Sequence, residues 1–307
     1  MEQEWKCFLS HFEVYLRLER LLSDHSIAAY LADVAKFSRF MLGKAVSPLT
    51  VDTAHIQEFL ATLHDVGMMA TSQSRILSGL RVFYKFLWLG RHITKDPTKL
   101  IESPQLGKYL PSVLSVFQVE AMVHAIDHST PIGMRNRAIV ETLYGTGVRV
   151  SELISLKLSH IYFEENFVRV IGKGNKERLI PIGAVALKYI KHYVQEVRSH
   201  MAIQSDYLDT LFLNRRGRGL TRVMIFLMVQ ALARKAKVQV EVGPHIFRHS
   251  FATHLIEGGA DLRAIQEMLG HSSITTTEIY THLDKSYLKQ VMQTYHPRSH
   301  LNGSKIL

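Results

Sequence analysis

Apolar residues recur at helical spacing through the first hundred residues of the chain. Four stripes, with members three or four positions apart, each predict one amphipathic helix. They consist of Phe8, Phe12 and Leu16; Tyr30, Val34, Phe37 and Met41; Ile56, Leu60 and Leu63; and Ile76, Leu80, Phe83 and Leu87. Ser23 and residues 50–52 are suited to cap helix N-termini. We therefore predict a four-helix bundle whose aromatic residues form its core.

The helical pattern stops between residues 96 and 111. Proline and glycine interrupt this segment, at Pro97, Pro104, Gly107 and Pro111. Proline and glycine at this frequency are typical of a linker. Beyond it, Ser115 and Gln118 have the spacing of a capping box, which predicts that another helix begins there. The predicted parts are a helical domain over 1–95, a linker over 96–111, a second domain over 112–298 and a tail over 299–307.

The second domain combines helical patterns with one β interruption. Two runs rich in branched residues, 167–171 and 178–182, flank the turn-forming residues 172–177 and predict a β-hairpin. Gly258-Gly259 would end one helix, and Asp261 would cap the next. The later helical patterns cover residues 184–200, 221–237, 244–257, 262–269 and 274–282. The fold class expected is mainly α with a small β-hairpin or sheet.

Composition narrows the class of protein. The 307 residues are 47% hydrophobic and 21% charged, which is ordinary for a soluble protein of two domains. No run approaches the roughly 18 apolar residues of a membrane span, and the N-terminus is acidic and polar, unlike a secretory signal. Cys7 is the only cysteine, which excludes an internal disulfide and zinc sites built from several cysteines. We expect a cytoplasmic protein with no membrane partner.

Positive charge is concentrated in the second domain. The whole chain carries a formal charge of +10, and residues 1–103 hold 12 Lys and Arg against 11 Asp and Glu. Residues 104–307 hold 25 against 16 and therefore account for nearly all of the excess. An excess of this kind suits a polyanionic partner such as DNA.

Several polar residues could take part in chemistry, although each alone has an ordinary structural explanation. His245 and Arg248 are three apart at the start of a helical run, a place suited to a phosphate but also to a plain basic surface. Arg149 follows a glycine-rich turn, and Lys173 stands between two glycines. Tyr280 lies in a threonine-rich segment where a buried, hydrogen-bonded tyrosine would be unexceptional.

Together these residues are far more specific than any one alone. In chain order they are Arg149, Lys173, His245, Arg248, His271 and Tyr280. The segments that carry them are residues 146–153, 172–178, 244–254, 258–263, 269–271 and 279–282. With these segments the chain resembles the tyrosine recombinase, or phage integrase, family, most closely the Xer recombinases of the XerD-like branch. The resemblance covers essentially the whole chain. It implies a SAM-like core-binding domain and a catalytic domain that hold DNA in a C-shaped clamp.

The resemblance also implies strand exchange through a covalent 3′-phosphotyrosyl intermediate, without ATP, cofactor or metal. Arg149 and Arg248 would clamp the non-bridging oxygens of a phosphodiester with charge-assisted bonds. His271 would donate a further hydrogen bond to the same group. Preorganised donors of this kind contribute roughly 3–4 kcal/mol each.

The remaining roles concern protons. Tyr280 would be the nucleophile, and a phenol with a pKa near 10 needs a base at neutral pH. His245 would accept its proton, and Lys173 would protonate the leaving 5′-oxygen. His245 and His249 also have the spacing of a zinc helix, but the glutamate of that motif is absent and Arg248 would repel a metal. We therefore expect no metal site.

Other charged residues near these motifs leave more than one interpretation open. Glu152, three residues after Arg149, either orients groups of the active site or pairs structurally with a neighbouring cation. Lys176 and Arg178 are interpreted as contacts to the DNA backbone. The segment 215–218 is either a solvated basic loop or a phosphate contact.

The leading hypothesis is a recombinase that resolves chromosome dimers at a dif-like site. The resemblance implies double-stranded DNA as substrate, a XerC-like partner in a heterotetramer, and a septal DNA translocase as a possible activator. The alternatives are an integrase of a mobile element, a type IB topoisomerase, and a DNA-binding protein that does not cleave.

The end of the chain carries one more helical pattern, over residues 284–294. Tyr287 or Leu288 with Val291 gives it a short apolar stripe, and a helix this short needs packing to be stable. It would pack either on its own domain or, as the resemblance implies, on a neighbouring subunit.

Overall fold

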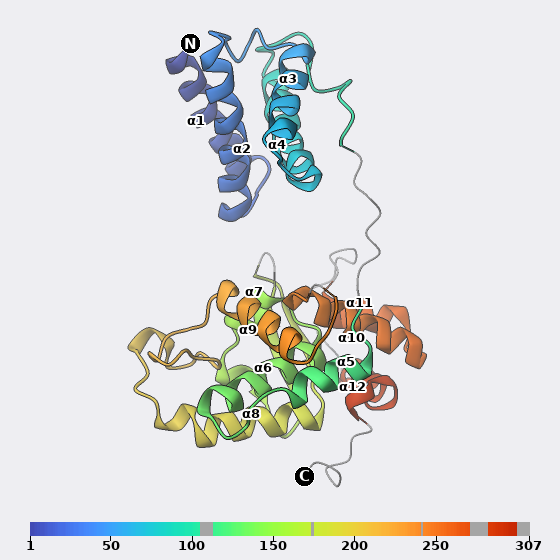
Figure 1. The fold of residues 1–307 in the computed structure, drawn as a ribbon. Helices are drawn as coiled ribbons and strands as arrows, with labels where there is room; N and C mark the ends of the chain where they lie inside the picture. Colours follow the sequence, from blue (N-terminus) through green and yellow to red (C-terminus); the bar gives the residue numbers. More distant parts are fainter. Residues whose placement is uncertain (105–112, 173–174, 241, 271–281, 300–307) are drawn as a thin grey trace. The chain divides into compact units, whose positions relative to one another are not determined.

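The structure is a computed structural model, and it describes residues 1–104, 113–172, 175–240, 242–270 and 282–299 (Figure 1). The chain forms two compact units, Met1–Tyr109 and Leu110–Leu307. Each unit has a hydrophobic core of its own. Among the described residues, no helix is both long enough and apolar enough to cross a membrane.

The first unit contains the four helices that the apolar stripes predict. They are α1 (Glu2–Leu18), α2 (Asp24–Gly43), α3 (Thr53–Asp65) and α4 (Ala70–Leu89). Ser23 caps α2 as predicted, and its side chain accepts from the backbone N–H of Ser26. Asp52 caps α3 in a reciprocal pairing with His55. These caps satisfy backbone donors that a helix start leaves unpaired.

The chain continues to pack on this bundle beyond α4. Ile101 is 6% exposed and belongs to the core of the first unit. Arg81 of α4 donates to the Ile101 carbonyl at 2.6 Å, and Thr53 of α3 donates to the Pro97 carbonyl at 3.1 Å. The first residues of the predicted linker therefore lie against the helices.

The second unit is mostly helical around a small sheet. Its α-helices are α5 (Val116–His124), α6 (Pro131–Thr146), α7 (Val150–Ile154), α8 (Ala184–Glu196), α9 (Arg222–Lys235), α10 (Pro244–Gly258), α11 (Leu262–Leu269) and α12 (His282–Tyr295). Short 3-10 helices are η1 (Leu158–His160), η3 (Arg198–His200), η4 (Ser205–Tyr207) and η5 (Pro297–Ser299). The predicted capping box of Ser115 and Gln118 opens α5, and Asp261 caps α11. The predicted helix over 274–282 falls almost entirely outside the described residues.

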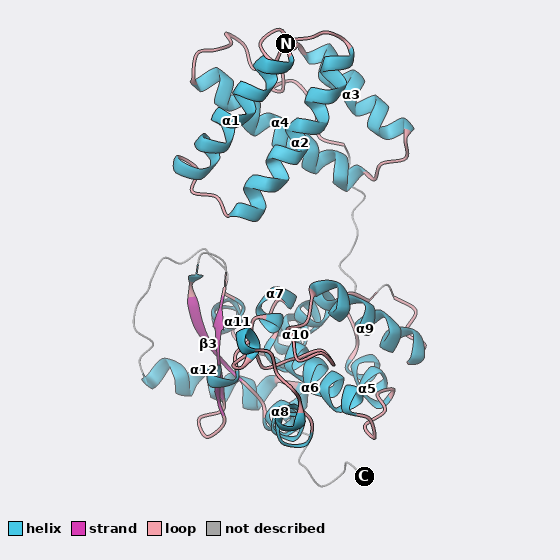
Figure 2. Ribbon diagram, turned by 90° about the vertical axis from the view of Figure 1, so that its left-hand side faces the viewer, coloured by secondary structure: helices cyan, strands magenta, loops and turns pink. Residues whose placement is uncertain are grey.

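The sheet has three antiparallel strands in the order β1-β2-β3. The strands are β1 (Ile161–Tyr162), β2 (Phe167–Ile171) and β3 (Glu177–Pro181). The predicted hairpin is confirmed as β2 and β3, with Val168 opposite Ile180. Strand β1 was not predicted, because two residues are too short to show a period. Figure 2 shows the sheet at one side of its unit, beside α11 and α12.

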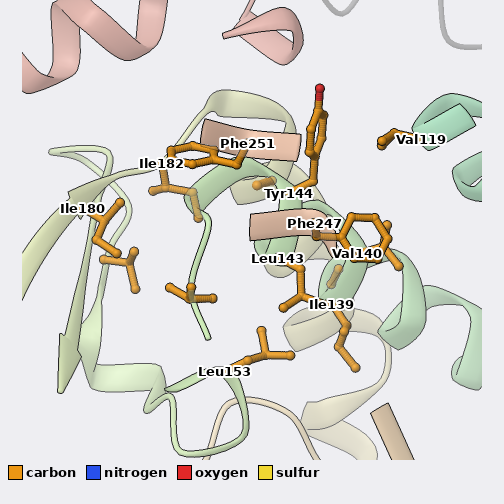
Figure 3. Close-up of a cluster of buried hydrophobic side chains, with 14 of the residues drawn as sticks. Val119, Ile139, Val140, Leu143, Tyr144, Leu153, Ile180, Ile182, Phe247 and Phe251 are labelled. Atoms are coloured by element: carbon orange, nitrogen blue, oxygen red, sulfur yellow. The ribbon is translucent and has the colours of Figure 1, made fainter. Parts of the chain in front are cut away.

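Helix α6 lies in the core of the second unit, where it packs on α8 and α10. Leu143 of α6 and Phe247 and Phe251 of α10 are fully buried. Figure 3 shows these side chains together with Ile180 and Ile182 from the end of the hairpin. The core thus fixes the C-terminal end of α6 against α10, and the chain leaving α6 enters α7.

Helix α12 packs on its own unit. Leu288, Val291 and Met292 are almost fully buried in the core of that unit. Arg298, which follows in η5, donates to the buried carboxylate of Glu141 on α6 at 3.0 Å. Of the two arrangements expected for this helix, the structure has packing on its own domain, since that domain covers the apolar stripe.

Candidate active site

The site begins at the turn between α6 and α7. Gly147 caps α6 in the left-handed conformation, with φ +61. A Cβ at this position would lie 2.5 Å from a ring carbon of Phe251, so the turn needs glycine for its conformation and for its close approach to α10. Two residues later, Arg149 is the N-cap of α7, and its side chain is partly exposed.

Arg248 joins three segments that are far apart in sequence. Its Nη1 donates to the Gly147 carbonyl at 2.9 Å, and its Nη2 donates to the Leu269 carbonyl at 2.6 Å. Burial, and then the positive charge of Arg149, lower the pKa of the Arg248 guanidinium to about 10. The group is therefore still charged at neutral pH, and a phosphodiester between two such cations would be stabilised by both.

Glu152 is buried between the guanidinium groups of Arg149 and Arg178. Arg149 donates to it twice, from its backbone N–H at 2.8 Å and from Nη1 at 2.9 Å. Arg178 of β3 donates from Nη1 and Nη2, each at 2.9 Å, as a bidentate pair. Burial acts to raise the pKa of Glu152, but the bonds from Arg178 and Arg149 outweigh it and hold the pKa below its usual value. Glu152 thus pairs with neighbouring cations, and one of these is the candidate catalytic Arg149.

Arg178 does not have the role that the sequence suggested. Its side chain is 7% exposed, and its Nε donates to the Met268 carbonyl at 2.9 Å while the other two nitrogens bind Glu152. The prediction that Arg178 contacts the DNA backbone is therefore wrong, because the guanidinium is turned into the protein. Lys176 is exposed, and its predicted contact stays a prediction.

His245 lies in the first turn of α10, directly after Gly243 and Pro244 open the helix. Its side chain is exposed, whereas Arg248 one turn later is half-buried. His249, the other histidine of the excluded metal motif, is also exposed. In the described part of the chain, no group of three or more histidine, cysteine, aspartate or glutamate side chains is arranged to hold a metal ion.

The other three predicted site residues, Lys173, His271 and Tyr280, lie outside the described residues. Gly172 and Gly270, which directly precede Lys173 and His271, belong to the described residues. A Cβ on Gly172 would lie 3.2 Å from Nη1 of Arg178 and 3.4 Å from Oε1 of Glu152. A Cβ on Gly270 would lie 3.0 Å from Cδ of Arg178. The residues that directly precede Lys173 and His271 are therefore packed against the cluster that holds Arg149.

The structure thus holds two of the six predicted residues through separate partners: Arg149 bonds Glu152, and Arg248 bonds the Gly147 and Leu269 carbonyls. Positive charge exceeds negative charge here, since Arg149 and Arg178 share the single carboxylate of Glu152 and Arg248 bonds only carbonyls. Such an arrangement can bind a phosphodiester and stabilise additional negative charge on it. Sequence reasoning missed the sharing of Glu152 between two arginines; the only local signal was its position three residues after Arg149.

Two family models match the chain. The model of the phage integrase family covers residues 112–287. The model described as the phage integrase N-terminal SAM-like domain covers residues 9–89. The two matches fall one in each compact unit.

Curated relatives match nearly end to end. Tyrosine recombinase XerD of Chlorobaculum tepidum is 43% identical over 97% of this chain and 98% of its own length. Tyrosine recombinase XerD of Staphylococcus saprophyticus is 42% identical over 93% of this chain and 97% of its own.

Solved structures agree with these matches. The XerH site-specific recombinase bound to a palindromic difH substrate, in a post-cleavage complex, has a TM-score of 0.69 and is 26% identical. The alignment covers 93% of this chain and 84% of that chain. A lambda integrase dimer bound to a core site shares the fold, with a TM-score of 0.68 at 20% identity over 89% of this chain and 98% of that one.

Proposed function

The chain belongs to the phage integrase family, as a site-specific DNA recombinase of the Xer tyrosine type, and from this premise we propose that it resolves chromosome dimers at a dif-like site. Its substrate in this proposal is double-stranded DNA, which it cleaves and rejoins through a covalent 3′-phosphotyrosyl intermediate. Two features support a dif-like site: the curated relatives are named XerD, and the XerH structure holds a difH substrate.

One observation carries the chemistry. Arg248 bonds both the Gly147 carbonyl and the Leu269 carbonyl, so the turn before Arg149 and the segment before His271 are held at one guanidinium. A phosphate bound by Arg149 and Arg248 would then lie beside the places where the chain enters Lys173 and His271. Positioning of this kind lowers the barrier because the reacting groups need no further ordering.

The proposed step is a transesterification at phosphorus. The oxygen of Tyr280 forms a bond to the phosphorus as the bond to the 5′-oxygen breaks. His245 accepts the phenolic proton, and Lys173 supplies a proton to the leaving oxygen. Arg149, Arg248 and His271 stabilise the charge on the non-bridging oxygens. The 5′-hydroxyl of another strand reverses the step, so no external energy source is needed.

In the proposed assembly, this chain acts in a heterotetramer with a XerC-like recombinase, and a septal DNA translocase activates it. The reaction would take place in the cytoplasm, where chromosomal DNA lies. The family resemblance supports both partners, and cleavage assays with and without each protein would test them.

The deciding experiment maps cleavage on dif-like DNA. The full chain is incubated with a labelled, nicked duplex, with and without a XerC-like partner, and adducts are resolved on denaturing gels. We expect one protein–DNA adduct at a single phosphodiester, and none with Tyr280→Phe. Cleavage without a preferred site, with relaxation of plain supercoiled DNA, would instead indicate a topoisomerase. Binding without any adduct would indicate a DNA-binding protein that does not cleave.

A further inference from the structure

The guanidinium of Arg178 lies where three segments of the second unit meet. It is carried by β3, it binds Glu152 on α7 with two nitrogens, and its Nε donates to Met268 in the last turn of α11. Each of its three nitrogens therefore bonds to a different atom of the protein. Such a fork fixes direction as well as distance, which the single ammonium of a lysine would not do.

Arg149 and Arg178 share Glu152 but differ in access to solvent. The side chain of Arg149 is 37% exposed and that of Arg178 is 7% exposed. Arg149 can therefore contact a ligand, whereas Arg178 can act on the site only through Glu152 and the α11 carbonyl. Because Arg178 neutralises Glu152, the charge of Arg149 is not fully cancelled by that carboxylate.

Two glycines enclose Arg178. The position of a Cβ on Gly172 is 3.2 Å from Nη1, and that on Gly270 is 3.0 Å from Cδ and 3.1 Å from Nε. Gly270 has φ +65, so a side chain there would be strained as well as crowded. These glycines directly precede Lys173 and His271, so both segments start from backbone packed on the Arg178 side chain.

We propose that Arg178 is a positioning residue for the recombination reaction: it sets Arg149 through Glu152 and fixes the backbone from which Lys173 and His271 follow. This inference rests on the proposed function. It predicts that Arg178 matters for cleavage of bound DNA and little for binding it. A shift of about 1 Å in such a site can lower the rate by about 100-fold.

The test compares Arg178→Lys with a matched control, Arg198→Lys. Arg198 is buried to a similar extent, 7% exposed as a whole residue against 6% for Arg178, and it donates to the backbone carbonyls of Thr210 and Leu208, which are not among the contacts of the site. Both variants keep the positive charge but replace the planar guanidinium, with its several donors, by a single ammonium group. Urea denaturation, duplex affinity and the single-turnover rate of adduct formation on a nicked substrate are measured for each. We expect Arg178→Lys to cleave about 10- to 100-fold more slowly at saturating DNA, and Arg198→Lys to cleave within about threefold of wild type.

A second comparison separates positioning from general loss of structure. Because Arg178 acts in part through Glu152, the losses of the two variants will not multiply fully, and Arg178→Lys combined with Glu152→Gln will cleave faster than the product of the two single losses predicts. Three results would overturn the inference and leave the proposed function standing. They are rate losses that multiply fully in the double variant, a normal cleavage rate in Arg178→Lys, and equal rate losses in Arg178→Lys and Arg198→Lys. A wild-type protein that forms no adduct would overturn the proposed function itself.

Discussion

Glu152 accepts four hydrogen bonds from two arginines, one of which is the candidate catalytic Arg149. A buried carboxylate is costly unless it is paired, and here the pairing is complete enough to lower its pKa below the usual value of 4.5. In return, Glu152 fixes both the backbone and the side chain of Arg149. The same group therefore contributes to stability and to the geometry of phosphate binding.

Replacing Glu152 with Gln should destabilise the second unit by about 3–5 kcal/mol, because two guanidinium groups lose their shared anion. The effect has a defined pH dependence. Since the folded-state pKa is lowered, the ionised carboxylate contributes stability that is fully present above pH 4.5 and is lost as the pH falls through the folded-state value. Urea midpoints of wild type and variant should therefore differ most near neutral pH and converge in acid. A difference between the two urea midpoints that grows as the pH falls would contradict the assignment of Glu152 as an ionised, stabilising carboxylate.

At Tyr280, the change to Phe removes only the phenolic oxygen. We expect covalent attachment to fall below detection, while the affinity for duplex DNA stays within about twofold, because the basic surface is unchanged. Gel shifts on intact duplex and denaturing gels on a nicked substrate measure the two properties separately. A wild-type amount of adduct in the variant would show that another residue is the nucleophile.

At the scale of elements, α12 shows how the end of the chain is attached. Its stripe of Leu288, Val291 and Met292 is buried in its own unit, and η5 adds the ion pair of Arg298 with Glu141. A truncation before Leu288 would expose this core and would test stability more than assembly. Point substitutions on the helix are therefore the sharper experiment.

Leu288→Ala should lower the free energy of unfolding by about 2–5 kcal/mol, since the side chain is 1% exposed. Tyr287→Ala, one position earlier and 47% exposed, should change it by no more than about 0.5 kcal/mol. Urea denaturation followed by circular dichroism measures both. Equal effects would mean that α12 does not pack on its own unit in solution.

At the scale of the whole molecule, the charge distribution sets how DNA binding depends on salt. Residues 104–307 carry nearly all of the formal excess of +10, so many phosphate contacts are expected from the second unit. Each contact releases counterions and adds about −0.9 to the slope of log K against log salt. We expect a slope of about −5 or steeper in fluorescence anisotropy titrations of duplex DNA by the full chain. A slope near zero would remove the electrostatic basis of binding.

The sequence by itself determined the features that depend on neighbours along the chain. The four apolar stripes of the first unit, the caps at Ser23, Asp52 and Ser115, and the β2–β3 hairpin can all be recognised within a few residues. This works because helix and strand periods and capping bonds act over one or two turns. The order of the six candidate residues likewise needs no coordinates to be recognised.

Only the tertiary structure decided which charged groups meet. Arg178 looked like a surface cation in the sequence, yet it is buried against Glu152, 26 positions away, and Met268, 90 positions away. The packing of Leu288 on its own unit also arises from contacts between segments far apart in the chain. A local pattern gives the spacing of side chains but not their partners. Whether a given arginine is solvated or buried depends on which carboxylates and carbonyls the folded chain brings within hydrogen-bonding distance.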